Sequence, residues 1–165
     1  AILVGAPINC LPKALKSFRG VKRRFSYKIK KNNLILIDDY AHHPTEIKAL
    51  HQAVTEMYPN DKKQIVFQPH LFSRTKDFGT EFAESLSAFD EIILLDIYPA
   101  REKPIEGITS NWLLKMIRND SKVIAQKKQL STLMKDSDCM VKLMVGAGDI
   151  GVEVENITNY LTNEN

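Results

Sequence analysis

The sequence predicts an α/β fold of the Rossmann-like, doubly wound type, in which helices cover both faces of a mostly parallel sheet. Segments with the spacing of strands alternate with segments with the spacing of helices along most of the 165 residues. The strand segments are almost continuously apolar, as strands buried on both faces must be. Polar clusters follow several of these strands directly, and in open parallel sheets ligands bind at that edge.

The expected strands are short and rich in Ile, Val and Leu. Phe25 to Lys30 alternates between apolar and polar residues, which indicates an edge strand, and residues 31–33 form a turn. The later runs lack this alternation and therefore predict buried strands. These runs are Leu34 to Ile37, Gln64 to Gln68, Glu91 to Asp96, Lys122 to Ala125 and Met140 to Val145.

Helices are expected between the strands, because apolar residues recur there every three or four positions. One helix should run from Pro44 to Met57, one should be capped by Ser110, and a polar one should run toward Lys135. Four apolar faces result, formed by Ile47, Leu50, Val54 and Met57; by Phe78, Phe82, Leu86 and Phe89; by Leu113, Leu114 and Ile117; and by Ile150, Val154, Ile157 and Leu161.

Residues 1–20 differ from the rest of the chain. Leu11, Ala14, Leu15 and Phe18 have helical spacing, and Gly20 can end that helix. We expect this segment to be the end of a preceding domain, followed by a hinge at residues 21–24.

Composition excludes several classes of protein. Hydrophobic residues make up 44% and charged residues 26%, as in an ordinary globular domain. No apolar run approaches the roughly 20 residues of a membrane helix, so no membrane partner is expected. The two cysteines have neither metal-ligand spacing nor framework partners, which is typical of reduced thiols in the cytoplasm.

The net charge of +3 is unevenly distributed. Residues 1–37 hold nine Lys and Arg and no acid, whereas the remainder holds 14 Lys and Arg against 20 acids. A nucleic-acid partner is not expected, because the basic segment lacks interleaved stacking aromatics. The basic segment is better interpreted as one that lines a nucleotide cleft, or as one that is simply solvated.

Four polar clusters follow the expected strands. Parallel strands bring their carboxyl ends to the same edge of a sheet, so these clusters should meet and form a functional edge. They are Asp38-Asp-Tyr-Ala-His-His43, Gln68-Pro-His-Leu-Phe-Ser-Arg-Thr75, Asp96-Ile-Tyr-Pro-Ala-Arg-Glu102 and Gly146-Ala-Gly-Asp-Ile-Gly151.

A transition-metal site is one alternative for this edge, because carboxylates and imidazoles gather there. It is disfavoured, because the adjacent His42 and His43 cannot easily share a metal and no second compact ligand pair follows. One of these histidines is instead expected to cap the helix that begins at Pro44. A nucleophilic Ser73 is also disfavoured, because no strained G-x-S-x-G turn surrounds it.

Gly146 to Gly151 matches the dinucleotide pattern G-x-G-x-x-G. Only 14 residues follow Gly151, too few for the second strand and the ribose-binding acid of that motif. Two interpretations remain open: an anion at the helix N-terminus, or a tight turn with Asp149 as helix cap.

Arg74 follows a strand and opens a helix. There its guanidinium could hold a carboxylate through two parallel hydrogen bonds. A surface ion pair is the alternative.

Five segments together resemble one family. Asp38-Asp-Tyr-Ala-His-His-Pro-Thr-Glu46 is similar to the signature of the Mur ligases, which attach an amino acid or a whole peptide to UDP-N-acetylmuramate. Phe67-Gln-Pro-His-Leu-Phe-Ser-Arg-Thr75 looks like the branch that adds L-alanine. The segments 20–25, 96–102 and 146–151 also match, in family order.

The resemblance implies a bacterial, cytoplasmic enzyme of three domains that uses ATP and Mg²⁺. The lactyl carboxylate of UDP-N-acetylmuramate would attack ATP to give an acyl phosphate, and the amine of L-alanine would then displace phosphate. Because the chain lacks G-x-x-x-x-G-K-[ST], ATP and Mg²⁺ should be held mainly by the missing central domain, and the missing N-terminal domain should hold the UDP-sugar. Residues 1–20 would be the C-terminal remnant of the central ATPase domain plus the hinge, and residues 21–165 the amino-acid-binding domain.

The resemblance also implies roles for six residues, and no metal ligand. Arg24 should lie near the adenine and Asp39 should hold the ribose of ATP. The alanine and acyl-phosphate pocket should contain the substrate-binding residues Tyr40 and Arg74, of which Arg74 takes the alanine carboxylate, and the catalytic residues His42 and His70.

Two departures from the family pattern bear on these roles. Many relatives carry Arg at the position of Leu71, and many carry Gly at the position of Ala41. Two other functions remain open: a murein-peptide recycling ligase, and a free-standing α/β module that binds a small anion. In every case we expect no turnover from this chain alone.

Overall fold

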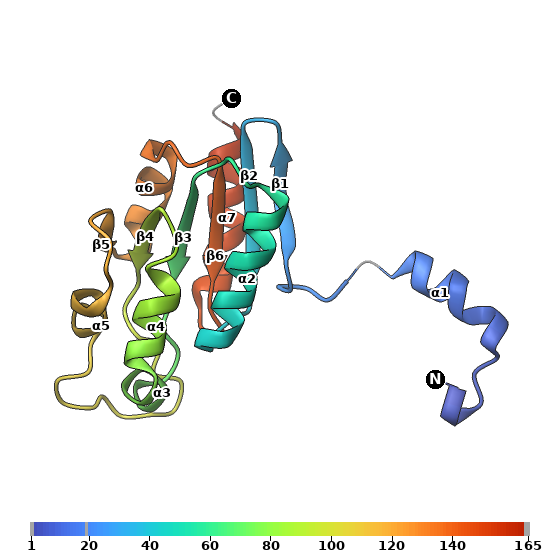
Figure 1. The fold of residues 1–165 in the computed structure, drawn as a ribbon, viewed down its shortest axis with the longest axis horizontal. Coiled ribbons are helices and arrows are strands. Elements are labelled where there is room, and N and C mark those ends of the chain that lie inside the picture. Colours follow the sequence, from blue (N-terminus) through green and yellow to red (C-terminus); the bar gives the residue numbers. More distant parts are fainter. Residues whose placement is uncertain (1, 19, 164–165) are drawn as a thin grey trace.

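The computed structural model describes residues 2–18 and 20–163 and shows a six-stranded sheet with helices on both faces (Figure 1). The strand order is β1-β2-β6-β3-β4-β5, and every pairing is parallel except that of β1 with β2. The predicted fold class is therefore confirmed, as is the edge strand. The strands are β1 (Ser26–Lys31), β2 (Leu34–Asp39), β3 (Lys63–Phe67), β4 (Glu91–Leu94), β5 (Lys122–Ile124) and β6 (Val141–Val145).

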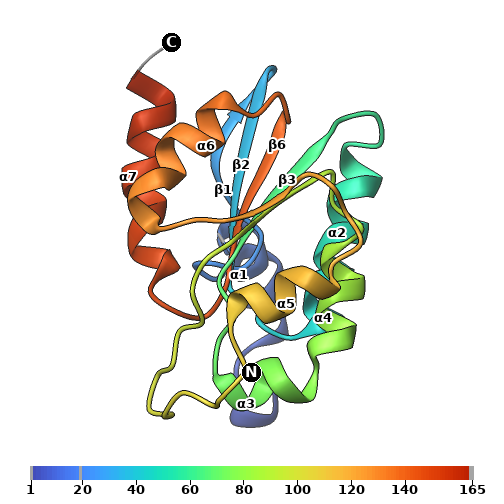
Figure 2. The same ribbon diagram turned by 90° about the vertical axis from the view of Figure 1, so that its left-hand side faces the viewer.

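The helices form two layers that enclose the sheet. α2, α4 and α5 lie on one face, and α6 and α7 lie on the other (Figure 2). None of the helices in the described part of the chain has the length and apolarity to cross a bilayer. The helices of the two layers and their connections are α2 (Pro44–Met57), α3 (Phe72–Asp77), α4 (Gly79–Leu86), α5 (Ser110–Met116), η3 (Lys127–Gln129), α6 (Leu130–Asp136) and α7 (Ile150–Asn163).

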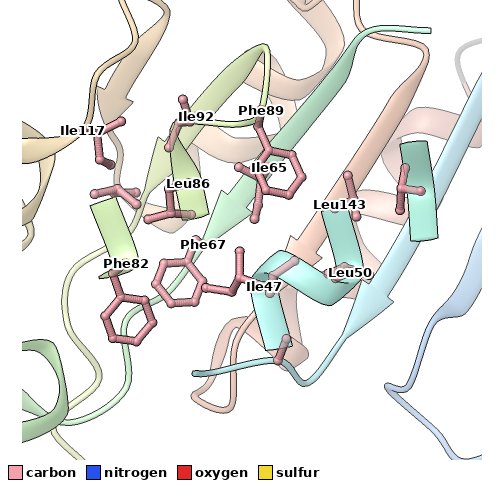
Figure 3. Packing of buried hydrophobic residues seen from close by; sticks show 14 of the residues in the cluster. Ile47, Leu50, Ile65, Phe67, Phe82, Leu86, Phe89, Ile92, Ile117 and Leu143 are labelled. Atoms are coloured by element: carbon pink, nitrogen blue, oxygen red, sulfur yellow. The ribbon is translucent and has the colours of Figure 1, made fainter. Parts of the chain in front are cut away.

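Alternation along the central strands builds the two cores. On β3, Ile65 and Phe67 pack toward α2 and α4, whereas Val66 packs toward α7 (Figure 3). All three side chains are fully buried, and such burial contributes about 1.5–3 kcal/mol each. The central strands therefore form a rigid base for the loops that follow them.

One predicted helix is present but interrupted, because the chain breaks the helical stretch into α3 and α4 at Phe78. That residue has a non-helical backbone, with φ −116° and ψ 23°. A Cβ on the next residue, Gly79, would lie 2.3 Å from the Trp112 ring, so the indole packs directly on the backbone. Phe82 and Leu86 still share a buried face, and Phe89 reaches the core from the loop after α4.

The predicted cap of α5 is also wrong by one residue. Thr109 is the N-cap, and its side-chain oxygen accepts a hydrogen bond from the N–H of Trp112. Ser110 instead is buried, and its hydroxyl donates to the carbonyl of Leu95 at 2.7 Å. Thr109 lies on the extended backbone that an N-cap requires, whereas Ser110 is already helical.

The N-terminal segment projects away from the sheet (Figure 1). It contains η1 (Ile2–Val4), η2 (Ile8–Cys10) and α1 (Leu11–Ser17), and α1 is the helix expected there. Residues 1 and 19, which belong to the same predicted segment, lie outside the described residues. Several large apolar side chains of the segment are exposed, namely Ile2, Leu3, Val4, Ile8, Leu15 and Phe18.

Candidate ligand site at the carboxyl edge of the sheet

The parallel register brings the predicted polar clusters to one edge. β6 lies between β2 and β3 and pairs with both, so residues 39, 67 and 145 are aligned at the ends of these strands. β4 continues the row, and an isolated bridge joins His70 to Tyr98 beyond the strand ends. The loops after β2, β3, β4 and β6 therefore surround a common region.

His42 has a tautomer that its surroundings determine. Its Nδ1 lies 2.9 Å from the carbonyl oxygen of Tyr40 and 3.4 Å from a carboxylate oxygen of Glu46. Both oxygens are acceptors, so Nδ1 must carry the hydrogen. In the neutral ring Nε2 is then left with a lone pair, as a proton acceptor requires.

His70 has the opposite arrangement. Its Nδ1 accepts a hydrogen bond from Arg74 Nη1 at 3.3 Å, so the neutral ring carries its hydrogen on Nε2. The ring is stacked on Tyr98, with centroids 5.6 Å apart. Burial and, after it, the positive charge of Arg74 hold the pKa of His70 below its usual value, which favours the neutral ring.

The predicted site residues form a continuous row of contacts. The guanidinium of Arg24 lies 6.0 Å from the Tyr40 ring centroid, and that ring meets the His42 ring edge-on at 5.3 Å. The His42 and His70 rings are 6.1 Å apart, and His70 contacts Arg74. The row thus ends in a guanidinium at both ends, so it suits an anionic ligand.

Asp39 stands at the base of this row rather than in it. Its two carboxylate oxygens accept hydrogen bonds from the backbone N–H groups of Phe25, at 2.6 Å, and Ala41, at 2.8 Å. Asp39 is only 8% exposed. The structure therefore gives Asp39 a clear architectural role, in which it connects the hinge to the loop after β2.

The hinge arginines have different environments. Arg23 donates to Asp38 at 3.2 Å and to the carbonyl of Gly146 at 2.6 Å, and its guanidinium lies 5.2 Å from the Tyr40 ring centroid. Burial raises the pKa of Asp38, and Arg23 opposes that effect. The side chain of Arg24 is 56% exposed, with Glu46 4.0 Å away, so it is the arginine more accessible to a ligand.

Glu46 is a site residue that the sequence interpretation did not single out. It accepts hydrogen bonds from the backbone N–H groups of His42 and His43. Burial alone would raise the pKa of Glu46, but these hydrogen bonds and the charge of His42 lower it below its ordinary value. Glu46 lies three residues after the N-cap His43, which is the spacing of a capping box. That spacing could have identified Glu46 from the sequence.

The glycine-rich turn before α7 is filled by the protein's own side chains. A Cβ on Gly148 would lie 2.4 Å from Gln68 Oε1 and 2.7 Å from Tyr98 Cβ, and one on Gly151 would lie 2.6 Å from the Arg23 guanidinium. Gln68 Oε1 also accepts the N–H of Ile150. Of the two open interpretations, the tight turn therefore fits better, because the glycines allow internal packing.

A residue from another strand stabilises the start of α7. The carboxylate of Asp149 accepts hydrogen bonds from Gln68 Nε2, at 2.7 Å, and from Lys127. The side chain of Gln68 takes the capping role, because its amide oxygen faces the first helical N–H. Sequence spacing could not indicate this, since Gln68 lies on a different strand.

Among the described residues, the histidines and aspartates of this edge do not converge on a metal-sized group. Asp38 faces Arg23 and Lys28, and His43 caps α2. Within the described residues, one group of potential metal ligands lies close together, namely Glu91, Asp138 and Cys139, beside the opposite edge of the sheet. There Lys62 already pairs with Asp138 at 2.8 Å, and burial raises the pKa of the Cys139 thiol to about 11, which disfavours the thiolate.

The two departures from the family pattern have different structural consequences. Ala41 is buried and is not among the described residues with positive φ, so alanine fits there without strain. Leu71 has φ +74°, in the left-handed region that a non-glycine residue rarely adopts. Its backbone N–H donates to the carbonyl of Tyr98, so the loop after β4 helps to hold this conformation.

The fold and this edge together define an α/β domain whose strand-end loops gather imidazoles and guanidiniums in one row, an arrangement that suits an anionic ligand. The model of the family described as "Mur ligase, glutamate ligase domain" matches residues 23–150. The chain therefore belongs to the Mur ligase family and contains its C-terminal domain.

Individual relatives narrow this assignment. The chain is 63% identical over 164 residues to a UDP-N-acetylmuramate–L-alanine ligase of Christiangramia forsetii, covering 99% of the chain and 36% of the relative. It is 61% identical over 157 residues to the enzyme of the same name from Flavobacterium psychrophilum, covering 95% of the chain and 35% of the relative. The chain thus spans about a third of the length of these curated relatives.

Solved structures agree with the fold. The UDP-N-acetylmuramate-alanine ligase of Thermotoga maritima superposes with a TM-score of 0.74 at 30% identity, over 99% of this chain and 35% of that one. A murein peptide ligase from Psychrobacter arcticus reaches a TM-score of 0.68 at 17% identity, over 98% of this chain and 34% of that one. At that identity the second likeness concerns the fold alone.

Proposed function

We propose that the chain is the C-terminal domain of an ATP-dependent ligase that adds L-alanine to UDP-N-acetylmuramate in peptidoglycan precursor synthesis. The observation that carries this proposal is the identity of 63% over 99% of the chain to a relative with that name. The row of Arg24, Tyr40, His42, His70 and Arg74 supports it, because an amino acid offers a carboxylate and an amine to match. ATP and a UDP-sugar are cytoplasmic metabolites, so we assign the enzyme to the bacterial cytoplasm.

The N-terminal segment supports a larger enzyme. Six of its large apolar side chains are exposed, from Ile2 to Phe18, and so many exposed apolar side chains on one short segment indicate an interface. We assign residues 1–20 to the end of the central ATPase domain plus the hinge, and residues 21–165 to the amino-acid-binding domain. The apolar face of α1 would then be covered by the missing central domain.

The residues at the edge fit ATP better than they fit Mg²⁺. The exposed guanidinium of Arg24 could lie against an adenine. The carboxylate of Asp39 already accepts hydrogen bonds from the backbone N–H groups of Phe25 and Ala41, so it could bind a ribose only through its remaining lone pairs. Mg²⁺ prefers carboxylate and water ligands, but the carboxylate of Asp38 already forms an ion pair with Arg23. We therefore assign Mg²⁺ to the missing domains.

In the proposed reaction the residues of this domain bind and orient the amino acid. Arg74 holds the carboxylate of L-alanine, which directs the amine toward the acyl phosphate. The Nε2 lone pair of His42 can accept a proton from the attacking amine, and the Nε2–H of His70 can donate to an oxygen of the acyl phosphate. Tyr40 forms the wall between these groups and Arg24.

The first experiment measures phosphate release by the full-length protein with ATP, Mg²⁺ and UDP-N-acetylmuramate. L-Alanine is compared with L-Ala-γ-D-Glu-diaminopimelate, in the wild type and in Arg74→Ala. A charge-assisted contact contributes about 1.5–3 kcal/mol, so Arg74→Ala should raise the KM for L-alanine roughly 10- to 100-fold. Lys76→Ala, which removes an exposed cation from the same helix, should leave that KM unchanged.

Each other outcome has a definite meaning. Release only with the tripeptide would identify a recycling ligase, and release with neither acceptor would favour the small-anion-binding module. The 165-residue chain alone should release no phosphate. ATP hydrolysis by this chain that Asp39→Ala abolishes would contradict the assignment of the ATPase core to missing domains.

A further inference from the structure

Helix α3, which carries Arg74, begins without a cap from its own sequence. Its N-cap is Leu71, whose side chain has no hydrogen-bonding group, and α3 has only six residues. The first turn of any helix leaves backbone N–H groups without partners inside the helix. Leu71 also has φ +74°, so the start of α3 is a strained point that something else must stabilise.

Glu102 supplies the missing cap from the loop between β4 and α5. One of its carboxylate oxygens accepts the backbone N–H of Ser73 at 3.0 Å, and the other accepts the Ser73 hydroxyl at 2.5 Å. A carboxylate at a helix N-terminus is also favoured by the helix dipole. These hydrogen bonds with Ser73 lower the pKa of Glu102, which keeps it ionised and able to accept them at neutral pH.

The loop that carries Glu102 is attached to the site at a second point. Tyr98 exchanges backbone hydrogen bonds with the segment before α3: its N–H donates to Pro69, and its carbonyl accepts from Leu71. Its ring stacks on His70. Glu102 in turn donates its backbone N–H to the carbonyl of Pro99, so a tight turn connects the two attachments.

These contacts converge on the pair that would receive an amino-acid carboxylate. Arg74 lies one residue after Ser73, and its guanidinium hydrogen-bonds with His70. The negative charge of Glu102 acts on both Arg74 and His70. A change in the first turn of α3 would therefore alter the distance between Arg74 and His70.

We infer that Glu102 is a positioning residue: by capping α3 from the loop after β4, it holds Arg74 and His70 in the arrangement that receives the carboxylate of the amino acid. Glu102 itself need not touch the ligand, because both of its oxygens face Ser73. The part of this inference that concerns a ligand rests on the proposed function, whereas the part that concerns α3 does not.

The first test uses the 165-residue chain without ligand. Hydrogen exchange of the Ser73 backbone amide and the ¹⁵N signals of the His70 ring are compared in the wild type, Glu102→Ala, Glu102→Gln and Glu106→Gln. In Glu102→Ala we expect the Ser73 amide to exchange at least tenfold faster and His70 to lose its single tautomer. Glu102→Gln, which keeps one acceptor oxygen, should show a smaller effect.

Glu106→Gln is the matched control, because Glu106 is an exposed acid of the same loop. It removes the same charge and should leave the Ser73 amide and the His70 ring unchanged. Unchanged exchange and an unchanged tautomer in Glu102→Ala would overturn the inference. If Glu102→Ala unfolds the chain, the test uses Ser73→Ala, which removes only the hydroxyl contact. This variant should still perturb the His70 signals, and unchanged His70 signals would equally overturn the inference.

The second test uses the full-length protein and measures KM and kcat. Glu102→Ala should raise the KM for L-alanine about tenfold while the KM for ATP stays constant, and Glu102→Gln should restore part of the loss. An unchanged KM for L-alanine, together with altered His70 signals in the first test, would overturn the positioning of Arg74. If the wild type does not use L-alanine at all, the proposed function fails, and the first test still decides whether Glu102 organises α3.

Discussion

The two adjacent histidines show how much a single residue's surroundings decide. His42 directs its ring toward Tyr40 and His70, whereas His43 lies on the extended backbone of an N-cap and accepts the N–H of Thr45. The His43 ring also packs edge-on against Phe78, 4.6 Å away. The sequence predicted that one of the pair caps α2, and this is confirmed, but only the structure identifies which.

Replacing His43 tests the cap. His43→Ala should lower the free energy of unfolding by about 1 kcal/mol, because the first turn of α2 loses a side-chain acceptor. His43→Asn, which keeps a capping oxygen, should recover most of that loss. Urea denaturation of the 165-residue chain measures both variants, and equal stability of His43→Ala and the wild type would contradict the capping role.

At the scale of elements, tertiary contacts decide where α4 and α5 begin. α4 begins at Gly79, where the Trp112 ring lies directly against the backbone and leaves no room for a side chain. α5 begins after Thr109 because Ser110 is held by the carbonyl of Leu95 at the end of β4. Neither contact leaves a mark in the local spacing of apolar residues, which explains both wrong boundaries.

The roles of Thr109 and Ser110 can be separated by mutation. Ser110→Ala should cost about 1–3 kcal/mol, because the buried carbonyl of Leu95 loses its donor. Thr109→Ala should cost about 1 kcal/mol, typical of an exposed N-cap. Thermal or urea unfolding of the two variants checks this order, and a larger loss for Thr109→Ala would contradict it.

At the scale of the whole molecule, two partly buried histidines make stability depend on pH. Burial lowers the pKa of both His51 and His70 below the value of an unfolded histidine, near 6.5. As the pH falls through that value, the unfolded chain binds protons that the folded chain resists, so the free energy of unfolding falls. This contribution is fully present above about pH 7 and is lost progressively as the pH falls below the pKa of an unfolded histidine.

His51 allows this prediction to be tested away from the proposed site. It packs against Phe89 on the α2 side of the sheet, with ring centroids 4.7 Å apart. His51→Gln should flatten the decrease in unfolding free energy between pH 7 and pH 5, measured by urea denaturation at several pH values. A decrease that is equally steep in the variant would show that His51 does not contribute.

The sequence by itself determined the α/β class, most strands and helices, and the meeting of the polar clusters at one edge. The physical reason is that strand and helix periods follow from local backbone geometry, and that parallel pairing brings strand ends together whatever their side chains are. The family resemblance also predicted five residues that the structure brings into one row, namely Arg24, Tyr40, His42, His70 and Arg74, and their roles stay predictions. Only the tertiary structure decided how the segments around this row are held. Asp39 accepts hydrogen bonds from two backbone amides, Gln68 holds the Gly148 turn, and Glu102, which is 29 residues from Ser73, caps α3. These contacts join side chains from separate elements, and no local spacing encodes a distance across the fold.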